Sequence, residues 1–224
     1  SRHLLSFKAA AFSQGVNPVK TFIPVAQFAD MLLNPGGNYS YNGKQRVYPD
    51  IELVYWAGGN PYHHHQNLNR LRQAWARPQT IIVHDFAWTA TARYADIVFP
   101  ANTSIERNDL GVSSSDNYIT PMRKAVSSYA ESKSDYDIFC GLSKHLDCLD
   151  AFSEGKGEMQ WVRHLYEQTV TNAQQHGIKL PNFEPFWEGG QLALAEQIER
   201  KKFFLEEFRR DPKENALRTP SGKI

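Results

Sequence analysis

Two glycines followed by an asparagine form the first group of residues in this sequence that could bind a ligand. Gly58, Gly59 and Asn60 follow an apolar segment, and Pro61 comes directly after them. Consecutive glycines permit positive φ angles and carry no Cβ, so the backbone can turn sharply and approach a phosphate or a flat ring. The Asn60 amide offers donors and an acceptor. This order predicts a nucleotide-binding turn, although a tight turn between a strand and a helix would use the same residues without any ligand.

A second polar group follows the apolar run 81–83 and consists of His84, Asp85 and Thr89. Ligands of open α/β sheets bind beyond the carboxyl ends of the strands. Asn60 and His84 are twenty-four positions apart, the reach of one strand–helix–strand unit, so we expect both side chains to line one crevice. Asp85 is placed to bind a ribose hydroxyl or the N–H edge of guanine, although it could instead satisfy loop amides.

The elements that position these residues follow the order of a parallel sheet with crossover helices. Residues 51–56 alternate and are rich in β-branched and aromatic types, which predicts a first strand, and residues 81–83 and 95–99 predict two more. Segment 68–75 carries apolar residues at i, i+3 and i+7, which predicts a helix with one buried stripe. We predict an α/β fold, a three-layer Rossmann-like domain with a mainly parallel sheet and flanking helices. The G-x-G-x-x-G and P-loop fingerprints are missing.

Before this region the sequence predicts a helix over 21–33 and a hairpin over 40–47. Asn42 and Gly43 stand at the hairpin tip, a strong signal for a type I′ turn. After it, residues 111–118 read as a polar loop.

The second half of the chain is predominantly helical in pattern. Ser134 can cap a helix. Another helix should run from Glu158 to about Gln175 and end at Gly177. The predicted core face of the first helix is Phe139, Leu142, Leu146 and Leu149, and that of the second is Met159, Val162, Tyr166 and Val170.

Three consecutive histidines, His63 to His65, raise the hypothesis of a metal site, but their spacing does not favour it. Adjacent residues on an extended segment point in different directions, and ligand pairs on a helix need i, i+4 spacing. We expect His63 to contact a bound ligand and His65 to have a structural role.

Composition excludes some classes of partner. The 224 residues carry 25 Lys and Arg against 24 Asp and Glu, a net charge of +1, so we expect no nucleic-acid partner. No apolar run approaches the ~20 residues of a membrane-spanning helix, so we expect no membrane insertion. Cys140 and Cys148 form neither a disulfide framework nor an iron–sulfur motif, and we expect both in the core.

The strings WAGGNPYHHHQNLNRLRQAW, VHDFAWTATARYADIVFPA and ERND, in this order and spacing, resemble the molybdopterin oxidoreductases of the dimethyl sulfoxide reductase family. The likeness is strongest to the trimethylamine N-oxide, dimethyl sulfoxide and biotin sulfoxide reductases. Later stretches agree, namely SDYDIF, EGKGEMQWVR, FEPFWEGG, FRRDP and LRTPSGKI. The likeness covers about 47–224.

This resemblance implies a bis(molybdopterin guanine dinucleotide) molybdenum cofactor and oxygen-atom transfer from an S-oxide or an N-oxide. Carried over by position, Asn60 and His84 would contact the cofactor directly. Their neighbours in the site would be Gly58, Gly59, His63, Asp85 and Thr89. No catalytic residue and no protein-held metal can be assigned, because the segment that ligates molybdenum in such enzymes has no counterpart here. We expect the cofactor to be absent from the chain alone, and the chain alone to be inactive.

The resemblance also predicts the organisation of the chain. Residues 1–46 would be the lead-in and hairpin of a truncated domain, 47–180 the domain that binds the guanine dinucleotide, and 181–224 a peripheral segment. The expected partners are further domains of the same protein, a small oxide substrate and a cytochrome electron donor. The expected location is the periplasm, with the cytoplasm as the alternative.

Two other readings stay open at this point. One is a different molybdopterin oxidoreductase, of the formate dehydrogenase or nitrate reductase type. The other is a free-standing, non-catalytic nucleotide-binding module.

Overall fold

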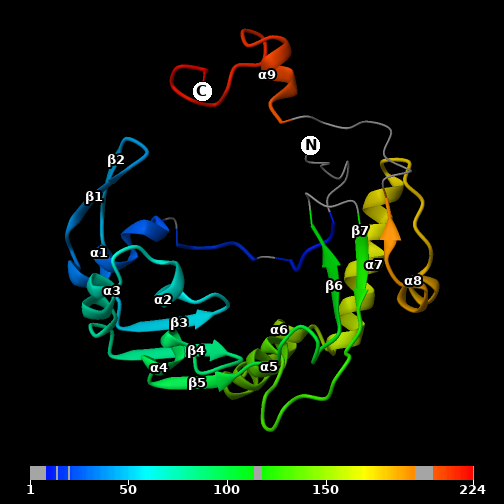
Figure 1. Cartoon of the computed structure of the whole chain (residues 1–224), viewed down its shortest axis with the longest axis horizontal. Helices are drawn as coiled ribbons and strands as arrows, with labels where there is room; N and C mark the ends of the chain where they lie inside the picture. The colour runs from blue at the N-terminus through cyan, green and yellow to red at the C-terminus, as the bar shows by residue number, and fades with distance from the viewer. Residues whose placement is uncertain (1–8, 14, 20, 114–117, 195–203, 224) are drawn as a thin grey trace. The chain divides into compact units, whose positions relative to one another are not determined.

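The protein is described from a computed structural model (Figure 1), in which helices and strands carry the labels used below. The described residues are 9–13, 15–19, 21–113, 118–194 and 204–223.

The chain divides into two compact units. Unit 1 comprises Ser1–Ser13, Asn108–Arg123 and Lys156–Ile224, and unit 2 comprises Gln14–Arg107 and Lys124–Gly155. Both units are therefore built from segments that are not consecutive in the sequence. The division into three consecutive parts, drawn from the resemblance, stays a prediction.

The parallel sheet of unit 2 consists of β3 (Leu53–Ala57), β4 (Thr80–Asp85) and β5 (Ile97–Pro100), in this order. Val54 lies opposite Ile81, and such β-branched side chains pack well on a pleated surface. In Figure 1 the three arrowheads point the same way. The structure confirms the predicted α/β fold with a parallel sheet. The strand β4 extends beyond the predicted run 81–83 and includes His84 and Asp85.

Three helices connect these strands, namely α2 (Pro61–His64), α3 (Leu68–Trp75) and α4 (Ala90–Arg93). The side chain of Asn67 caps α3 by accepting a hydrogen bond from the backbone of its third residue, Arg70. The predicted stripe of α3 is largely confirmed, because its two later apolar positions are buried. Its first position, Leu68, is 43% exposed.

A short helix and a hairpin precede the sheet. They are α1 (Phe28–Leu33), with one turn of 3-10 helix before it, and the strands β1 (Asn38–Tyr41) and β2 (Lys44–Val47). The predicted hairpin is confirmed, and both tip residues, Asn42 and Gly43, have positive φ angles of 48° and 71°. The helix is shorter at its start than predicted.

Two further helices of unit 2 follow the sheet, α5 (Asp135–His145) and α6 (Leu149–Ser153). The predicted cap is confirmed, because the Ser134 hydroxyl accepts a hydrogen bond from the backbone of Asp137 at 3.1 Å.

The predicted core face of α5 is wrong at its end. Leu146 is 73% exposed, while Ile138 and Ser143 are the buried residues of this helix. The helix ends at His145, so Leu146 leaves the helical periodicity on which the prediction rested. Cys140 is half-buried and Cys148 is exposed, so the expectation that both lie in the core is also wrong.

Two loop segments of unit 2, 101–107 and 124–133, are joined by a buried carboxylate. Glu106 is 9% exposed, and its oxygens accept hydrogen bonds from the Thr103 backbone and hydroxyl, both at 2.8 Å, and from the Tyr129 backbone at 2.9 Å. The backbone hydrogen bond from Thr103, followed by the other two, lowers the pKa of Glu106. Three hydrogen-bond donors on Thr103 and Tyr129 therefore hold the two segments together.

Unit 1 contains an antiparallel sheet of β6 (Asp109–Val112), β7 (Tyr118–Met122) and β8 (Leu192–Ala193). The predicted polar loop over 111–118 is wrong at both ends, because its first and last residues belong to strands. The segment resembles a loop because it is rich in glycine and serine, whereas Ile119, just beyond it, is 1% exposed and packs in the core of unit 1.

Within its described residues, unit 1 contains the helices α7 (Glu158–Gln174), α8 (Phe183–Gly189) and α9 (Glu206–Arg210). The rings of Tyr166 and Phe186 stack at 4.1 Å between centroids and join α7 to α8.

The predicted inward face of α7 is confirmed for Tyr166 and Val162, which are buried, but Met159 is 37% exposed. Residues 195–203 of the predicted peripheral segment lie outside the described residues. No helix in the described ranges combines the length and apolar character that a membrane crossing requires.

Candidate functional site

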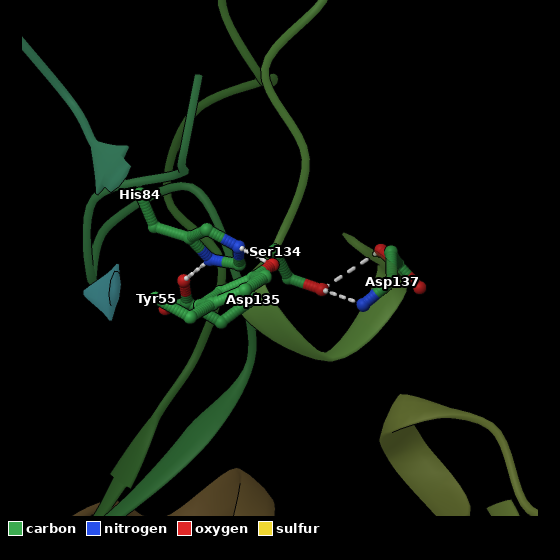
Figure 2. Close-up of polar contacts among 5 residues, drawn as sticks. All are labelled: Tyr55, His84, Ser134, Asp135 and Asp137. Carbon is green, nitrogen blue, oxygen red and sulfur yellow. Dashed lines mark hydrogen bonds and ion pairs between the residues drawn. The ribbon is translucent and has the colours of Figure 1, made fainter. Parts of the chain in front are cut away.

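His84 lies near the end of β4 and is the most highly connected of the predicted site residues. Its Nε2 lies 2.6 Å from the Tyr55 hydroxyl, and its Nδ1 lies 2.7 Å from Oδ1 of Asp135 (Figure 2). A carboxylate can only accept, so Nδ1 carries a proton, and in the neutral ring Nε2 then accepts the Tyr55 proton. His84 thereby joins β3, β4 and the first residue of α5.

The surroundings of His84 explain why it is fixed. The residue is 3% exposed, and its ring contacts Phe99 at 5.5 Å and Phe139 at 5.0 Å between centroids. A buried imidazole needs partners for both nitrogens, and Tyr55 and Asp135 supply them.

The charges of this group follow from the same contacts. The hydrogen bond from His84 lowers the pKa of Asp135, whose side chain is 50% exposed. Burial, followed by the nearby Asp135 charge, raises the pKa of Tyr55. The ionised carboxylate and the protonated phenol are thus the favoured forms, and they are the forms that the two hydrogen bonds require.

Asp85 and Thr89 close a short loop at the carboxyl end of β4. Oδ2 of Asp85 accepts a hydrogen bond from the Thr89 hydroxyl at 2.5 Å, and Thr89 Oγ1 accepts one from the Ala92 backbone at 3.2 Å, which caps α4. Thr89 therefore connects the end of β4 to the first turn of α4.

The glycine turn lies at the carboxyl end of β3. Gly58 and Gly59 have φ angles of 82° and 79°, which confirms the predicted positive values. A Cβ on Gly58 would meet no atom within 4 Å, and one on Gly59 would meet only Trp56 Nε1 at 3.9 Å. Both glycines are exposed, so an incoming group can approach this backbone closely.

Asn60 bonds to α4 as well. Its Oδ1 accepts a hydrogen bond from the buried Thr91 hydroxyl, and that hydroxyl also accepts one from the Tyr62 backbone at 3.3 Å. The Asn60 carbonyl accepts from the backbones of His63 and His64, which begins α2. His63 is exposed, with its ring 5.1 Å from that of His64.

Three predicted residues, Asn60, Asp85 and Thr89, are thus bonded to the start of α4, and Gly58 and Gly59 directly precede Asn60 in the chain. We name them the carboxyl-edge cluster: Gly58, Gly59, Asn60, Asp85 and Thr89.

The structure does not bring Asn60 and His84 to one another. Val83 and Tyr62 belong to one core cluster with α3, and successive side chains of a strand point to opposite faces of the sheet. His84 therefore points to the other face, where α5 lies, while Asn60 lies with Tyr62. They do not line one crevice with their side chains, and cofactor contact by either residue stays a prediction.

Some connected residues could not be found by sequence reasoning. Asp135 lies fifty-one positions after His84, and Tyr55 reads as an ordinary strand residue. Thr91 could have been found from the sequence, because it lies in the same polar stretch after β4 as Thr89. Trp88 and Phe86, from the same stretch, are 69% and 70% exposed.

Two other features lie apart from the carboxyl-edge cluster. A groove of about 720 Å³ runs between α3 and the segment before β5, lined by Arg72, Trp75 and Tyr94 among others. It includes none of the predicted site residues. In the described ranges, no three His, Cys, Asp or Glu side chains are grouped to hold a metal ion.

A comparison with known families decides the relationship of the chain. The family model described as molybdopterin oxidoreductase matches residues 9–145, more than half of the sequence. The chain belongs to the molybdopterin oxidoreductase family. Membership implies a molybdenum–pterin cofactor.

Relatives in this family carry names that agree with the predicted subgroup. The chain is 52% identical over 97% of its length to a biotin sulfoxide reductase of Cereibacter sphaeroides, and it covers 29% of that protein. It is 47% identical over 91% of its length to a dimethyl sulfoxide/trimethylamine N-oxide reductase of the same organism, covering 25%. A trimethylamine-N-oxide reductase of Haemophilus influenzae is 43% identical over 98% of this chain, which covers 27% of it. The chain thus spans about a quarter of these curated relatives.

A solved structure supports the fold. Acetylene hydratase from Pelobacter acetylenicus matches 79% of this chain with a TM-score of 0.50 and 17% identity, and the match covers 22% of that chain.

The chemistry of the carboxyl-edge cluster suits a polar group of a molybdenum–pterin cofactor better than a metal ion. The exposed glycine turn leaves room for a phosphate to approach the backbone. Thr89 and Asp85 supply a hydroxyl and a carboxylate, which bond to each other at the end of β4. These are groups that bind the polar parts of a nucleotide, and they do not form a set of metal ligands.

Proposed function

We propose that this chain holds a guanine dinucleotide end of the cofactor in a molybdenum-dependent S-oxide or N-oxide reductase. The observation that carries the proposal is the carboxyl-edge cluster, where a turn of two positive-φ glycines leads into Asn60, which bonds to Thr91 of α4, and where Asp85 bonds to Thr89, the N-cap residue of α4. The names and identities of the sulfoxide and N-oxide reductases support the reaction class.

Each residue of the cluster has a defined task in this proposal. Gly58 and Gly59 let the backbone approach the pyrophosphate, because no side chain projects there. Asp85 accepts hydrogen bonds from the guanine N–H edge, and Thr89 holds that carboxylate in place through its 2.5 Å hydrogen bond. Asn60 is held by Thr91 and fixes the exit of the glycine turn.

His84 acts indirectly in this scheme. By fastening β3 and β4 to α5, it keeps the ends of the two strands at a constant separation. When bound, the cofactor supplies two-electron oxygen-atom transfer, and the residues of this chain supply binding and orientation.

The test uses the full-length protein purified with its cofactor. Guanine nucleotide released by acid would be quantified per molybdenum, together with oxide-dependent oxidation of a reduced viologen. Asp85→Asn removes the charge but keeps the size. We expect nucleotide retention to weaken roughly 10- to 100-fold, since a hydrogen bond to a charged group contributes ~1.5–3 kcal/mol.

Asp30→Asn is the matched control. Asp30 also lies in unit 2 and pairs with Arg70 on an exposed surface, so this variant loses the same charge away from the cluster. It should retain nucleotide like the wild type. A wild-type protein that yields molybdenum and pterin but no guanine nucleotide would refute the proposal.

A further inference from the structure

One face of the parallel sheet packs against α3, whereas the other face is bare at the amino end of the strands. On the first face, Val54, Ile81 and Val83 are 7%, 3% and 0% exposed and share a core cluster with residues of α3. On the second face, Leu53 of β3 is 53% exposed and Ile97 of β5 is 45% exposed. The sheet is therefore apolar on both faces but buried on only one of them at this end.

The strand register places the exposed side chains in one patch. Ile82 of β4 lies opposite Tyr55 of β3 and Ile97 of β5, and Leu53 comes two residues before Tyr55. Residues two apart on a strand point to the same face, and so do residues paired across a parallel ladder. We name Leu53, Ile82 and Ile97 the amino-end face, because together they span all three strands of this sheet.

The helix α5 covers the second face only near the carboxyl ends of the strands. The ring of Phe139 in α5 lies 5.7 Å from that of Tyr55 and 5.0 Å from that of His84, between centroids. In Figure 1, α5 lies at the arrowhead end of β4 and β5. The exposed fractions of Leu53 and Ile97 show that α5 leaves the amino-end face open.

The chemistry of this face indicates what covers it. Parallel sheets are packed against helices on both faces, and a face that met water would carry polar side chains in place of leucine and isoleucine. Within the described residues, β3 is an edge strand that pairs with β4 alone, so its outer side is open to a further strand. A parallel strand added there would be connected through a crossover helix, which packs on a face of the sheet.

We propose that the amino-end face docks an apolar helix from the part of the full-length protein that lies outside this chain. The chain covers 25–29% of three curated relatives, so most of a protein of that length is available to supply the helix. The amino-end face lies at the opposite end of the strands from the carboxyl-edge cluster. The proposal therefore holds whatever ligand that cluster binds.

The first experiment measures maleimide labelling of cysteine variants of the full-length protein, read by peptide mass spectrometry. Leu53→Cys tests the amino-end face, and Val54→Cys is the matched control, because Val54 is the next residue of β3 and is buried against α3. Both positions should react ~10-fold or more slowly than in the urea-unfolded protein, as expected of groups that are reached only through local opening. Rapid labelling of Leu53→Cys beside a protected Val54→Cys would overturn the proposal.

The second experiment needs no substitution and identifies the occupant. Expression with a diazirine analogue of leucine places a photoreactive group at Leu53, and mass spectrometry then identifies the peptide that is cross-linked to it. The expected partner is a helical peptide of the same molecule from outside residues 1–224. A cross-link to unit 1, a cross-link to a second molecule in an isotopically mixed sample, or reaction with water alone would each overturn the proposal.

Discussion

Two tryptophans that pack together in unit 2 allow the contribution of one indole N–H hydrogen bond to stability to be measured. Trp56 and Trp75 pack against each other at 5.8 Å between centroids, and both contact Phe28. Nε1 of Trp75 donates to the Tyr94 carbonyl at 2.9 Å. Nε1 of Trp56 is buried without a hydrogen-bond partner in the described part of the chain. The same substitution, tryptophan to phenylalanine, therefore removes a satisfied donor at one site and an unsatisfied one at the other.

The expected difference follows from the cost of unpaired buried groups. Trp75→Phe leaves the Tyr94 carbonyl without its donor, a loss of ~1–3 kcal/mol, while Trp56→Phe relieves a penalty of similar size. Trp75 is 3% exposed and Trp56 is half-buried, so Trp75→Phe also leaves the larger cavity, which adds to the difference in the same direction. We expect Trp56→Phe to be more stable than Trp75→Phe by ~2–4 kcal/mol, or very roughly 5–15 °C in Tm.

Urea unfolding followed by far-UV circular dichroism measures this difference. The denaturant slopes of the two variants should be equal, so that the midpoints report stability alone. Equal destabilisation by the two substitutions would refute the reasoning, because it would show that the Trp56 N–H is satisfied in the folded protein.

Three further predictions concern single residues. His84→Phe keeps a ring between Phe99 and Phe139 but loses two hydrogen bonds, so it should lower the stability by ~1–2 kcal/mol. Without the hydrogen bond from His84, the pKa of Asp135 should rise towards 3.8, which an NMR titration would show. An unchanged pKa of Asp135 would contradict the contact. Because hydrogen bonds lower the pKa of Glu106 below 4.5, its carboxylate stabilises the fold above that pH and loses the effect as pH falls through the lowered pKa. Glu106→Gln should therefore flatten the decline of Tm on acidification, and a slope equal to that of the wild type would count against this. Ala130 has a φ angle of 49°, so Ala130→Gly should raise stability by ~0.5 kcal/mol in urea unfolding, where a loss would argue against strain.

Local signals in the sequence predict the central elements of the fold well. Positive φ angles occur at the hairpin tip, Asn42 and Gly43, and at the turn of Gly58 and Gly59. Glycine and asparagine adopt such angles more readily than other residues, so their presence predicts these turns. Ser134 caps α5 through a contact only three residues away. Each of these features depends on neighbours in the chain, which a single sequence contains.

Features that depend on distant partners could not be predicted. The orientation of His84 is set by Asp135 and Phe139, which lie more than fifty positions away, so its side chain turns towards α5 rather than towards Asn60. The strands β6 and β7 contain polar and glycine residues, and they are held by pairing with each other and by the core of unit 1.

The alternation of the chain between the two units constrains how the protein is made. Unit 2 is not complete until Lys124–Gly155 has been synthesised, because Asp135 in that stretch is the partner of His84. A ribosome that has delivered the three parallel strands has therefore exposed a sheet whose second face is still uncovered. Truncating the gene after Arg107 would leave that face permanently open, and a fragment cut there should aggregate rather than behave as an independent domain.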